Sequence, residues 1–263
     1  MLQELHLDLA QETDRITSFV RDSVTAAGFH RVVLGVSGGV DSALVAALCV
    51  RALGAENVLG LIMPSEISNP SSTEHGMLVI DQLGMPSEFV DITPMYRPLL
   101  DREPAMGGGR LGNIMSRLRM VTLYDRSASF SGLVMGTGNR TEWLLGYFTL
   151  YGDSAAALRP IAHLYKVQVR ELSTYLGLPD VVVTKAPSAD LWQGQTDEGD
   201  LGFSYDDADQ ILFLLTEQSL SVAEIASRGF SQATVEAVQR VYRRTAFKRA
   251  PVPVLDPVWQ SRR

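Results

Sequence analysis

The chain contains a single cysteine, Cys49, among its 263 residues, so no disulfide can form within it. A chain without disulfides fits a reducing compartment. There is no run of about 18 apolar residues, the length that a membrane-spanning helix needs. The first residues, MLQELHLDLAQETDR, lack the basic region and the apolar core of a secretory signal. We therefore expect a soluble, cytoplasmic protein with no membrane partner.

Positive charge is also scarce. The formal net charge is −7 at pH 7 and the isoelectric point is about 5.1, which argues against a general binder of nucleic acids. Only three of the 23 basic residues are lysine: Lys166, Lys185 and Lys248. A lysine ammonium is a compact charge on a flexible stem. A lysine kept where arginine is the usual cation is therefore a candidate for a specific role.

The first half of the chain alternates β-branched runs with patterns of helical spacing. The expected strands cover 31–36, 57–63, 88–91 and 132–136, and the expected helices cover 11–28, 41–53, 74–83 and 114–129. Strands joined by right-handed helical crossovers lie parallel, and helices then cover both faces of the sheet. We predict an α/β fold with a doubly wound parallel sheet flanked by helices.

Beyond residue 150 the pattern becomes helical. Helices are expected at 165–176, 205–215, 222–226 and 232–246. Two stretches, 106–109 and 188–202, are expected to be loops, and long ordered loops often serve as lids or binding loops. We find no internal repeat, so we expect residues 1–263 to form one domain with a helical C-terminal part.

The end of the first expected strand carries the sequence VLGVSGGVDSAL at residues 33–44. Ligands of an open parallel sheet bind beyond the carboxyl ends of its strands. Glycines before a helix let backbone N–H groups approach an anion there. We therefore expect a phosphate-binding loop; the alternative is a plain tight turn with Asp41 as the N-cap. Two other phosphate motifs, G-x-x-x-x-G-K-[ST] and G-x-G-x-x-G, are absent from the sequence.

The stretch SGGVDS, residues 37–42, resembles the pyrophosphate loop of the N-type ATP pyrophosphatases, which have an adenine nucleotide alpha hydrolase-like fold. This resemblance implies that ATP is split between its α- and β-phosphates, that the loop holds the pyrophosphate, and that Asp41 ligates Mg²⁺. A cation between an acid and a phosphate removes their mutual repulsion, which gives Asp41 a physical role.

Four further stretches follow in order: GTGNRTEWLLGYFTLYGD (136–153), LYKVQVRELSTYLGLP (164–179), APSADLWQGQTDEGDLGFSYDDAD (186–209) and FKRAPVPVLDP (247–257). This succession is similar to the ammonia-dependent NAD synthetases over nearly the whole chain. The resemblance implies a ligase that converts deamido-NAD, ammonia and ATP into NAD, AMP and pyrophosphate through an acyl-adenylate. It also implies a homodimer with deamido-NAD at the subunit boundary. Such a reaction needs positioning and electrostatics rather than a nucleophilic side chain.

The resemblance assigns roles by position. The implied ATP-binding residues are Gly35, Val36, Ser37, Gly38, Gly39, Val40, Asp41, Ser42, Thr137, Lys166 and Ser188. The implied magnesium ligands are Asp41 and Glu142, and the implied catalytic residues are Asp41 and Lys166. The implied deamido-NAD contacts are Arg117, Tyr147, Asp153, Asp200, Phe247 and Lys248. Each has a plainer alternative: Glu142 suits the first turn of any helix, Arg117 suits a basic surface helix, and Ser188 suits an ordinary loop.

Some positions depart from the family pattern. Leu150, Ala157 and Phe247 stand where relatives often have Lys, Asp and His, and all three positions belong to the deamido-NAD side. One explanation is that neighbours such as Arg159 or Arg249 make the contacts that the replaced side chains make in relatives. On the other, the chain is a paralogous ATP-dependent amide ligase acting on a different carboxylate. Ser116 also replaces a usual Ala, and Asp200 replaces a frequent Glu.

Two other functions fit the sequence less well. A tRNA-thiolating enzyme shares the loop but needs reactive cysteines and usually a basic surface. A nucleotide-binding regulator without turnover would not need both Asp41 and Glu142. Glutamine-dependent relatives carry an amidase domain with a cysteine nucleophile, for which this chain has no room. We therefore expect free ammonia as the direct donor, and a separate glutaminase as its source stays open.

Overall fold

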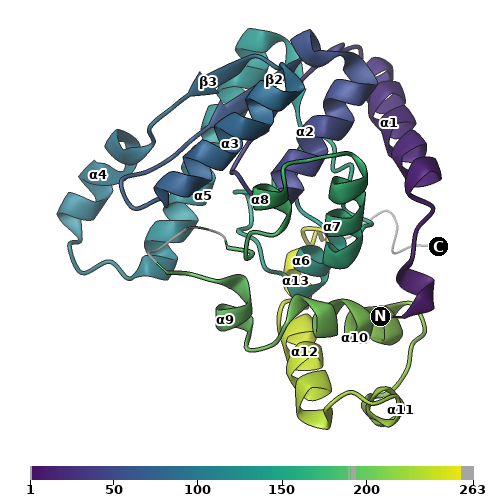
Figure 1. Cartoon of the computed structure of the whole chain (residues 1–263). Helices are drawn as coiled ribbons and strands as arrows, with labels where there is room; N and C mark the ends of the chain where they lie inside the picture. Colours follow the sequence, from purple (N-terminus) through teal and green to yellow (C-terminus); the bar gives the residue numbers. More distant parts are fainter. Residues whose placement is uncertain (1, 189, 191–193, 256–263) are drawn as a thin grey trace, which may run out of the picture.

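The computed structural model describes residues 2–188, 190 and 194–255. Four strands form one parallel sheet in the order β3-β2-β1-β4 (Figure 1). The chain moves outward from β1 in one direction to β2 and β3, and then crosses to the other side of β1 to add β4. The predicted doubly wound parallel sheet is therefore confirmed. The strands are β1 (Arg31–Gly35), β2 (Val58–Ile62), β3 (Ser87–Phe89) and β4 (Gly132–Val134).

The described residues form thirteen α-helices and two short 3₁₀ helices, Gln3–Leu5 and Ala55–Asn57. The α-helices are α1 (Leu9–Ala26), α2 (Val40–Leu53), α3 (Pro70–Leu83), α4 (Thr93–Arg102), α5 (Gly108–Phe130), α6 (Arg140–Leu145), α7 (Lys166–Tyr175), α8 (Asp180–Val183), α9 (Asp197–Leu201), α10 (Tyr205–Thr216), α11 (Val222–Ser227), α12 (Gln232–Arg244) and α13 (Ala246–Arg249). None of them is long and apolar enough to span a membrane.

The two predicted loops are only partly loops. Residues 106 and 107 precede α5, but 108 and 109 are already in its first turn. Within 188–202, residues 189 and 191–193 lie outside the described residues, and 197–201 form α9. The prediction of a continuous loop was wrong because Thr196 caps this helix: its side chain accepts a hydrogen bond from the N–H of Gly199.

The sheet is covered on both faces because successive side chains of β1 point to opposite sides. Val32 and Leu34 belong to a core formed with α1, α2 and α7. Val33 belongs to a second core, formed with α4 and α5. All three side chains are fully buried. The two cores pack the sheet between its helical layers, and Figure 1 shows helices on both sides of the strands.

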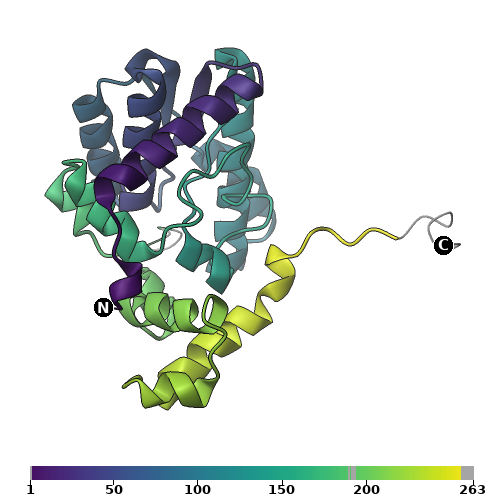
Figure 2. The ribbon, with the colours of Figure 1, turned by 90° about the vertical axis from the view of Figure 1, so that its right-hand side faces the viewer.

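The helical C-terminal part has a core of its own. Leu5, Leu144 and Tyr165 join it from earlier segments and pack with residues of α10, α11 and α12. These helices lie beyond the carboxyl edge of the sheet (Figure 1), and residues 250–255 extend away from them (Figure 2). The predicted helical C-terminal part is confirmed, and it faces the edge where a ligand of a parallel sheet binds.

Candidate active site

A cleft of about 1350 Å³ opens at the carboxyl edge of the sheet. The ends of β1 and β2 and the first turns of α2 and α3 contribute to its wall. Most of the predicted site residues line it together: Gly35, Val36, Ser37, Gly39, Val40, Asp41, Ser42, Thr137, Glu142, Tyr147, Asp153, Lys166, Ser188, Asp200 and Lys248. The residues predicted for ATP and those predicted for the acid therefore share one cavity.

The loop between β1 and α2 has the form of an anion site. Gly39 is the N-cap of α2, and no side chain caps this helix end, so Asp41 is not the N-cap of the plain-turn alternative. The hydroxyl of Ser42 accepts a hydrogen bond from the Ser37 N–H at 3.1 Å and donates to the Gly39 carbonyl at 3.0 Å. The loop is thus fixed from within, and its helix end presents N–H groups that lack side-chain partners.

Gly38 explains why this loop needs a glycine. Its φ is +75°, a left-handed conformation that favours glycine, and a Cβ here would clash with the Ser72 carbonyl oxygen in the first turn of α3. Gly38 does not line the cleft, unlike its predicted partners. It allows the loop and the start of α3 to pack closely.

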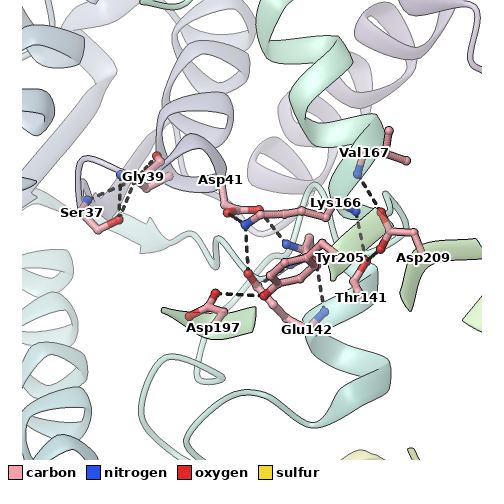
Figure 3. A network of polar contacts seen from close by, with 12 residues as sticks. Ser37, Gly39, Asp41, Thr141, Glu142, Lys166, Val167, Asp197, Tyr205 and Asp209 are labelled. Carbon is pink, nitrogen blue, oxygen red and sulfur yellow. Dashed lines mark hydrogen bonds and ion pairs between the residues drawn. The ribbon is translucent and has the colours of Figure 1, made fainter. Parts of the chain in front are cut away.

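Lys166, Asp41 and Glu142 meet beside this loop (Figure 3). The Lys166 Nζ forms an ion pair with Asp41 and lies 3.4 Å from Glu142 Oε1. Its side chain is only 3% exposed. Burial opposes the charge of Lys166, but the two carboxylates outweigh burial and raise its pKa. Burial and the neighbouring Asp41 carboxylate raise the pKa of Glu142 to about 8.

Two more groups enclose the ammonium. The ring of Tyr205 lies 5.2 Å from the Lys166 Nζ, and the Tyr205 hydroxyl donates to Asp197 Oδ2 at 3.0 Å. Burial raises the pKa of Asp197, which is on α9. Sequence reasoning missed both residues, although they lie within the motif 186–209. Their role depends on how α9 and α10 fold over the cleft.

Asn139 is a third residue that sequence reasoning missed. It is fully buried and is the N-cap of α6. Its Oδ1 accepts a hydrogen bond from the Glu142 N–H at 2.9 Å, and Glu142 Oε2 accepts from the Asn139 N–H at 3.2 Å. This reciprocal capping box fixes the helix that carries Glu142. The sequence NRTE, an N-cap residue followed three positions later by Glu, was the signal for it.

Asp209 holds the helix that carries Lys166. It is buried on α10 and accepts hydrogen bonds from Thr141 Oγ1 at 2.5 Å and from the Val167 N–H at 2.8 Å. The Thr141 hydroxyl in turn accepts from the Lys166 N–H at 3.1 Å. Burial raises the pKa of Asp209 to about 6. α6, α7 and α10 are thus joined directly behind the charged centre (Figure 3).

The residues predicted for the acid substrate form two smaller groups. Asp153 Oδ1 accepts from Ser116 Oγ at 2.7 Å and from the Thr149 N–H at 2.9 Å. Tyr147 donates to Asp200 Oδ2 at 2.8 Å. Ser116, the departure from the usual Ala, therefore supports Asp153. Both predicted acids face the cleft and have fixed orientations.

Lys248, on α13, lines the cleft together with Asp153 and Asp200. Its Nζ donates to the carbonyls of Gly146 at 2.7 Å and Phe148 at 2.6 Å. The neighbouring Arg249 donates to the carbonyls of Leu144 and Tyr242. Arg249 is therefore engaged at helix ends, which does not fit the idea that it compensates for the family departures.

Arg117 and Phe247 lie outside the cleft in the single chain. Arg117 is exposed and donates to the Leu150 carbonyl at 3.3 Å, and the side chain of Phe247 is 66% exposed. Leu150 and Ala157 do not line the cleft either. The second arginine of the same motif, Arg119, does line it and donates to the Met63 carbonyl at 2.9 Å. Sequence reasoning overlooked Arg119 because the family resemblance pointed to Arg117.

The carboxylates of Asp41 and Glu142 fit a magnesium ion. Both contact the same ammonium, so their oxygens converge, and Mg²⁺ prefers hard oxygen ligands. No cluster of three or more His, Cys, Asp or Glu side chains suited to a metal occurs among the described residues. Two carboxylates suffice when substrate phosphates supply further oxygens, which is the usual arrangement for Mg²⁺ at nucleotides.

Comparison with known proteins agrees with this geometry. The NAD synthase family model matches residues 12–252. The NH(3)-dependent NAD(+) synthetase of Chlorobium phaeobacteroides is 45% identical over 97% of this chain and 92% of its own length. The solved NH3-dependent NAD synthetase of Campylobacter jejuni superimposes with a TM-score of 0.81 at 32% identity, covering 95% of this chain and all of the other. The NMN synthetase of Francisella tularensis gives a TM-score of 0.84 at 31% identity, covering 96% and 100%. The chain belongs to the NAD synthase family.

Proposed function

We propose that this protein amidates the nicotinate carboxylate of deamido-NAD with ammonia and converts ATP into AMP and pyrophosphate. The observation that carries this proposal is the meeting of Asp41, Glu142 and Lys166 at the uncapped start of α2. Such a centre suits a triphosphate that is cleaved rather than merely bound. The chain would act as one domain, in the cytoplasm.

The reaction proceeds in two steps. A carboxylate oxygen of deamido-NAD attacks the α-phosphorus of ATP. The bond between the α-phosphorus and the oxygen that bridges to the β-phosphate breaks, and the N–H groups of the loop bind the pyrophosphate as it leaves. Ammonia then attacks the acyl carbon, AMP departs with the shared oxygen, and the nitrogen loses a proton. Magnesium held by Asp41 and Glu142 supplies charge neutralisation when bound. Lys166 orients these carboxylates and offsets their charge, because both of its ion pairs are with them.

We also propose that the protein works as a homodimer. Arg117, Val121 and Tyr124 lie on one face of α5, and all three are exposed, Val121 to 57% and Tyr124 to 41%. A second copy packed against this face would bury the apolar pair. It would also bring Arg117 toward an acid substrate that extends beyond the cleft, which accounts for its position outside the single chain's cavity.

A second candidate substrate is nicotinate mononucleotide. Leu150, Ala157 and Phe247 all depart from the family on the side of the acid. A mononucleotide lacks the adenylate half of deamido-NAD and needs fewer contacts there. The similarity to a protein named NMN synthetase supports this alternative, whereas the curated relatives of about 45% identity, named for NAD, favour the larger acid.

The experiment compares both acids with purified protein, ATP, Mg²⁺ and ammonium. Chromatography should detect NAD and AMP in equal amounts from deamido-NAD, with a higher kcat/KM than for the mononucleotide. Asp41→Ala should abolish AMP formation with either acid. If neither acid yields an amide and AMP, the proposal is wrong; a higher kcat/KM for the mononucleotide selects the second candidate.

A further inference from the structure

The cleft contains cations to which the reaction proposed above gives no role. Among the described residues, the cationic side chains that line the cleft are Arg119, Lys166, Lys185 and Lys248. Of these four, Lys166 alone forms an ion pair with another described residue. The other three donate to uncharged oxygens: Arg119 to Met63 O, Lys248 to two carbonyls, and Lys185 to the hydroxyl of Ser72.

The charged groups beside the loop do not supply enough positive charge to balance a bound triphosphate. Lys166 already faces two carboxylates, Asp41 and Glu142. Even with a divalent ion bound, these four charges sum to only about one positive charge. A triphosphate carries several negative charges, and its terminal phosphates leave as a highly charged anion. Transition-state stabilisation therefore calls for a further cation on the side of the β- and γ-phosphates.

Lys185 lies beside the start of α3, which packs against the SGG loop. Its Nζ donates to Ser72 Oγ at 3.0 Å. Ser72 is in the first turn of α3, and its carbonyl is the group that packs against Gly38 of the phosphate loop. Lys185 is therefore hydrogen-bonded to a residue that itself packs against the loop. The other two cations lie elsewhere: Arg119 at the end of β2 and Lys248 on the acid side.

Lys185 is also a cation without a direct carboxylate partner among the described residues. It is half-buried, and burial lowers its pKa, with Asp190 the one neighbouring charge that opposes this effect. The Asp190 oxygens accept from the Asn69 N–H at 3.0 and 3.1 Å, at the start of α3. A desolvated ammonium that holds only a hydroxyl is available to an incoming anion.

We propose that Lys185 is a second phosphate-binding lysine, which Ser72 positions beside the SGG loop so that it contacts the phosphoryl oxygens that leave as pyrophosphate. This inference rests on the proposed function, since it assigns a role within the same ATP cleavage. It also gives Lys185 a specific task, as the family resemblance implies for the other two lysines, Lys166 and Lys248.

The test measures binding of inorganic pyrophosphate with Mg²⁺, and of AMP, by calorimetry. Lys185→Gln should weaken pyrophosphate binding about tenfold, because it removes a charge-assisted hydrogen bond, and should leave AMP binding unchanged. Lys185→Arg should recover part of the loss. Ser72→Ala keeps the charge but removes its anchor, so its loss should be smaller. The matched control is Arg51→Gln, which removes one positive charge at the exposed C-terminal end of α2, remote from the loop.

Each outcome decides the matter. Unchanged pyrophosphate affinity in Lys185→Gln overturns the inference. An equal loss of affinity for AMP also overturns it, because it would mean that the substitution changes the shape of the cleft. An equal loss in Arg51→Gln would reduce the effect to net charge and also overturn it. Turnover of deamido-NAD by the unaltered protein is measured in parallel. If that turnover is absent while Lys185→Gln still weakens pyrophosphate binding, only the proposed acid substrate fails.

Discussion

The Asn139 Nδ2 donates a hydrogen bond to Asp41 Oδ1 at 2.7 Å, between residues that are 98 positions apart in the chain. The same amide caps α6 through its oxygen. One buried side chain thus orients both proposed magnesium ligands, Asp41 directly and Glu142 through the helix that carries it. The two ligands come from different crossovers of the sheet, and Asn139 sets their separation.

Asn139→Ala should therefore reduce both stability and metal use. The loss of the cap and of a buried hydrogen bond should lower the free energy of unfolding by about 1–3 kcal/mol, measured by urea denaturation. The Mg²⁺ concentration that gives half-maximal turnover should rise. As a control, Ser221→Ala removes a similar capping box from α11, away from the cleft. It should reduce stability without changing the dependence on Mg²⁺, and the same dependence in both variants would contradict the orienting role.

Asp209 should give the protein a recognisable pH dependence of stability. Its pKa is raised to about 6 in the fold by burial, whereas an unfolded Asp titrates near 3.9. Between these values the folded chain binds more protons than the unfolded chain, so stability from this group falls as pH rises. Above pH 6 the ionisation of Asp209 should have lowered the free energy of unfolding by about 2–3 kcal/mol.

Asp209→Asn removes this titration. The difference in unfolding free energy between the unaltered protein and the variant should decrease from pH 4 to pH 6 and stay constant above it. Denaturant melts at half-unit pH steps measure this difference, and other carboxylates cancel in the comparison. A difference that does not change with pH over this range would show that Asp209 is ionised throughout.

The proposed dimer predicts a strong effect of Val121→Arg. A charge in the middle of an apolar contact is costly to bury, so the variant should sediment as a monomer where the unaltered protein sediments as a dimer. Its KM for deamido-NAD should rise, and its KM for ATP should change little. Phe19→Arg places the same charge on an exposed apolar position of α1, where Phe19 is 45% exposed, and should keep the dimer. A monomeric unaltered protein would rule the dimer out.

Cys49 should be inert. It is fully buried in α2, and burial raises the pKa of its thiol to about 12, so almost no reactive thiolate forms at neutral pH. Iodoacetamide should not alkylate the native protein, as read by mass spectrometry, and Cys49→Ala should keep its turnover. Alkylation of the native protein accompanied by lost activity would contradict this expectation.

The predictable parts of the fold and site were local in sequence. The loop at 37–42 could be predicted because the strand end, the glycines and the helix start are consecutive residues. The parallel direction of the strands followed from alternation and crossover handedness, whereas their order in the sheet was not predicted. α4 was not predicted, because Pro94 and Pro98 interrupt its helical pattern.

The parts that escaped prediction depend on distant segments meeting. Asn139 reaches Asp41 only because β1 and β4 are neighbours in the sheet. Asp209 becomes a support for Lys166 only when α10 packs behind α7. The family resemblance assigned Arg117 and Phe247 to the acid substrate, but their exposure in one chain could not be read from any motif.

The cleft is lined by residues as far apart in the sequence as Gly35 and Lys248. Lys248 belongs to the last described helix and reaches back about a hundred positions to Gly146 and Phe148. This side of the cleft can therefore form only after Lys248 has been synthesised, well after the four strands of the sheet.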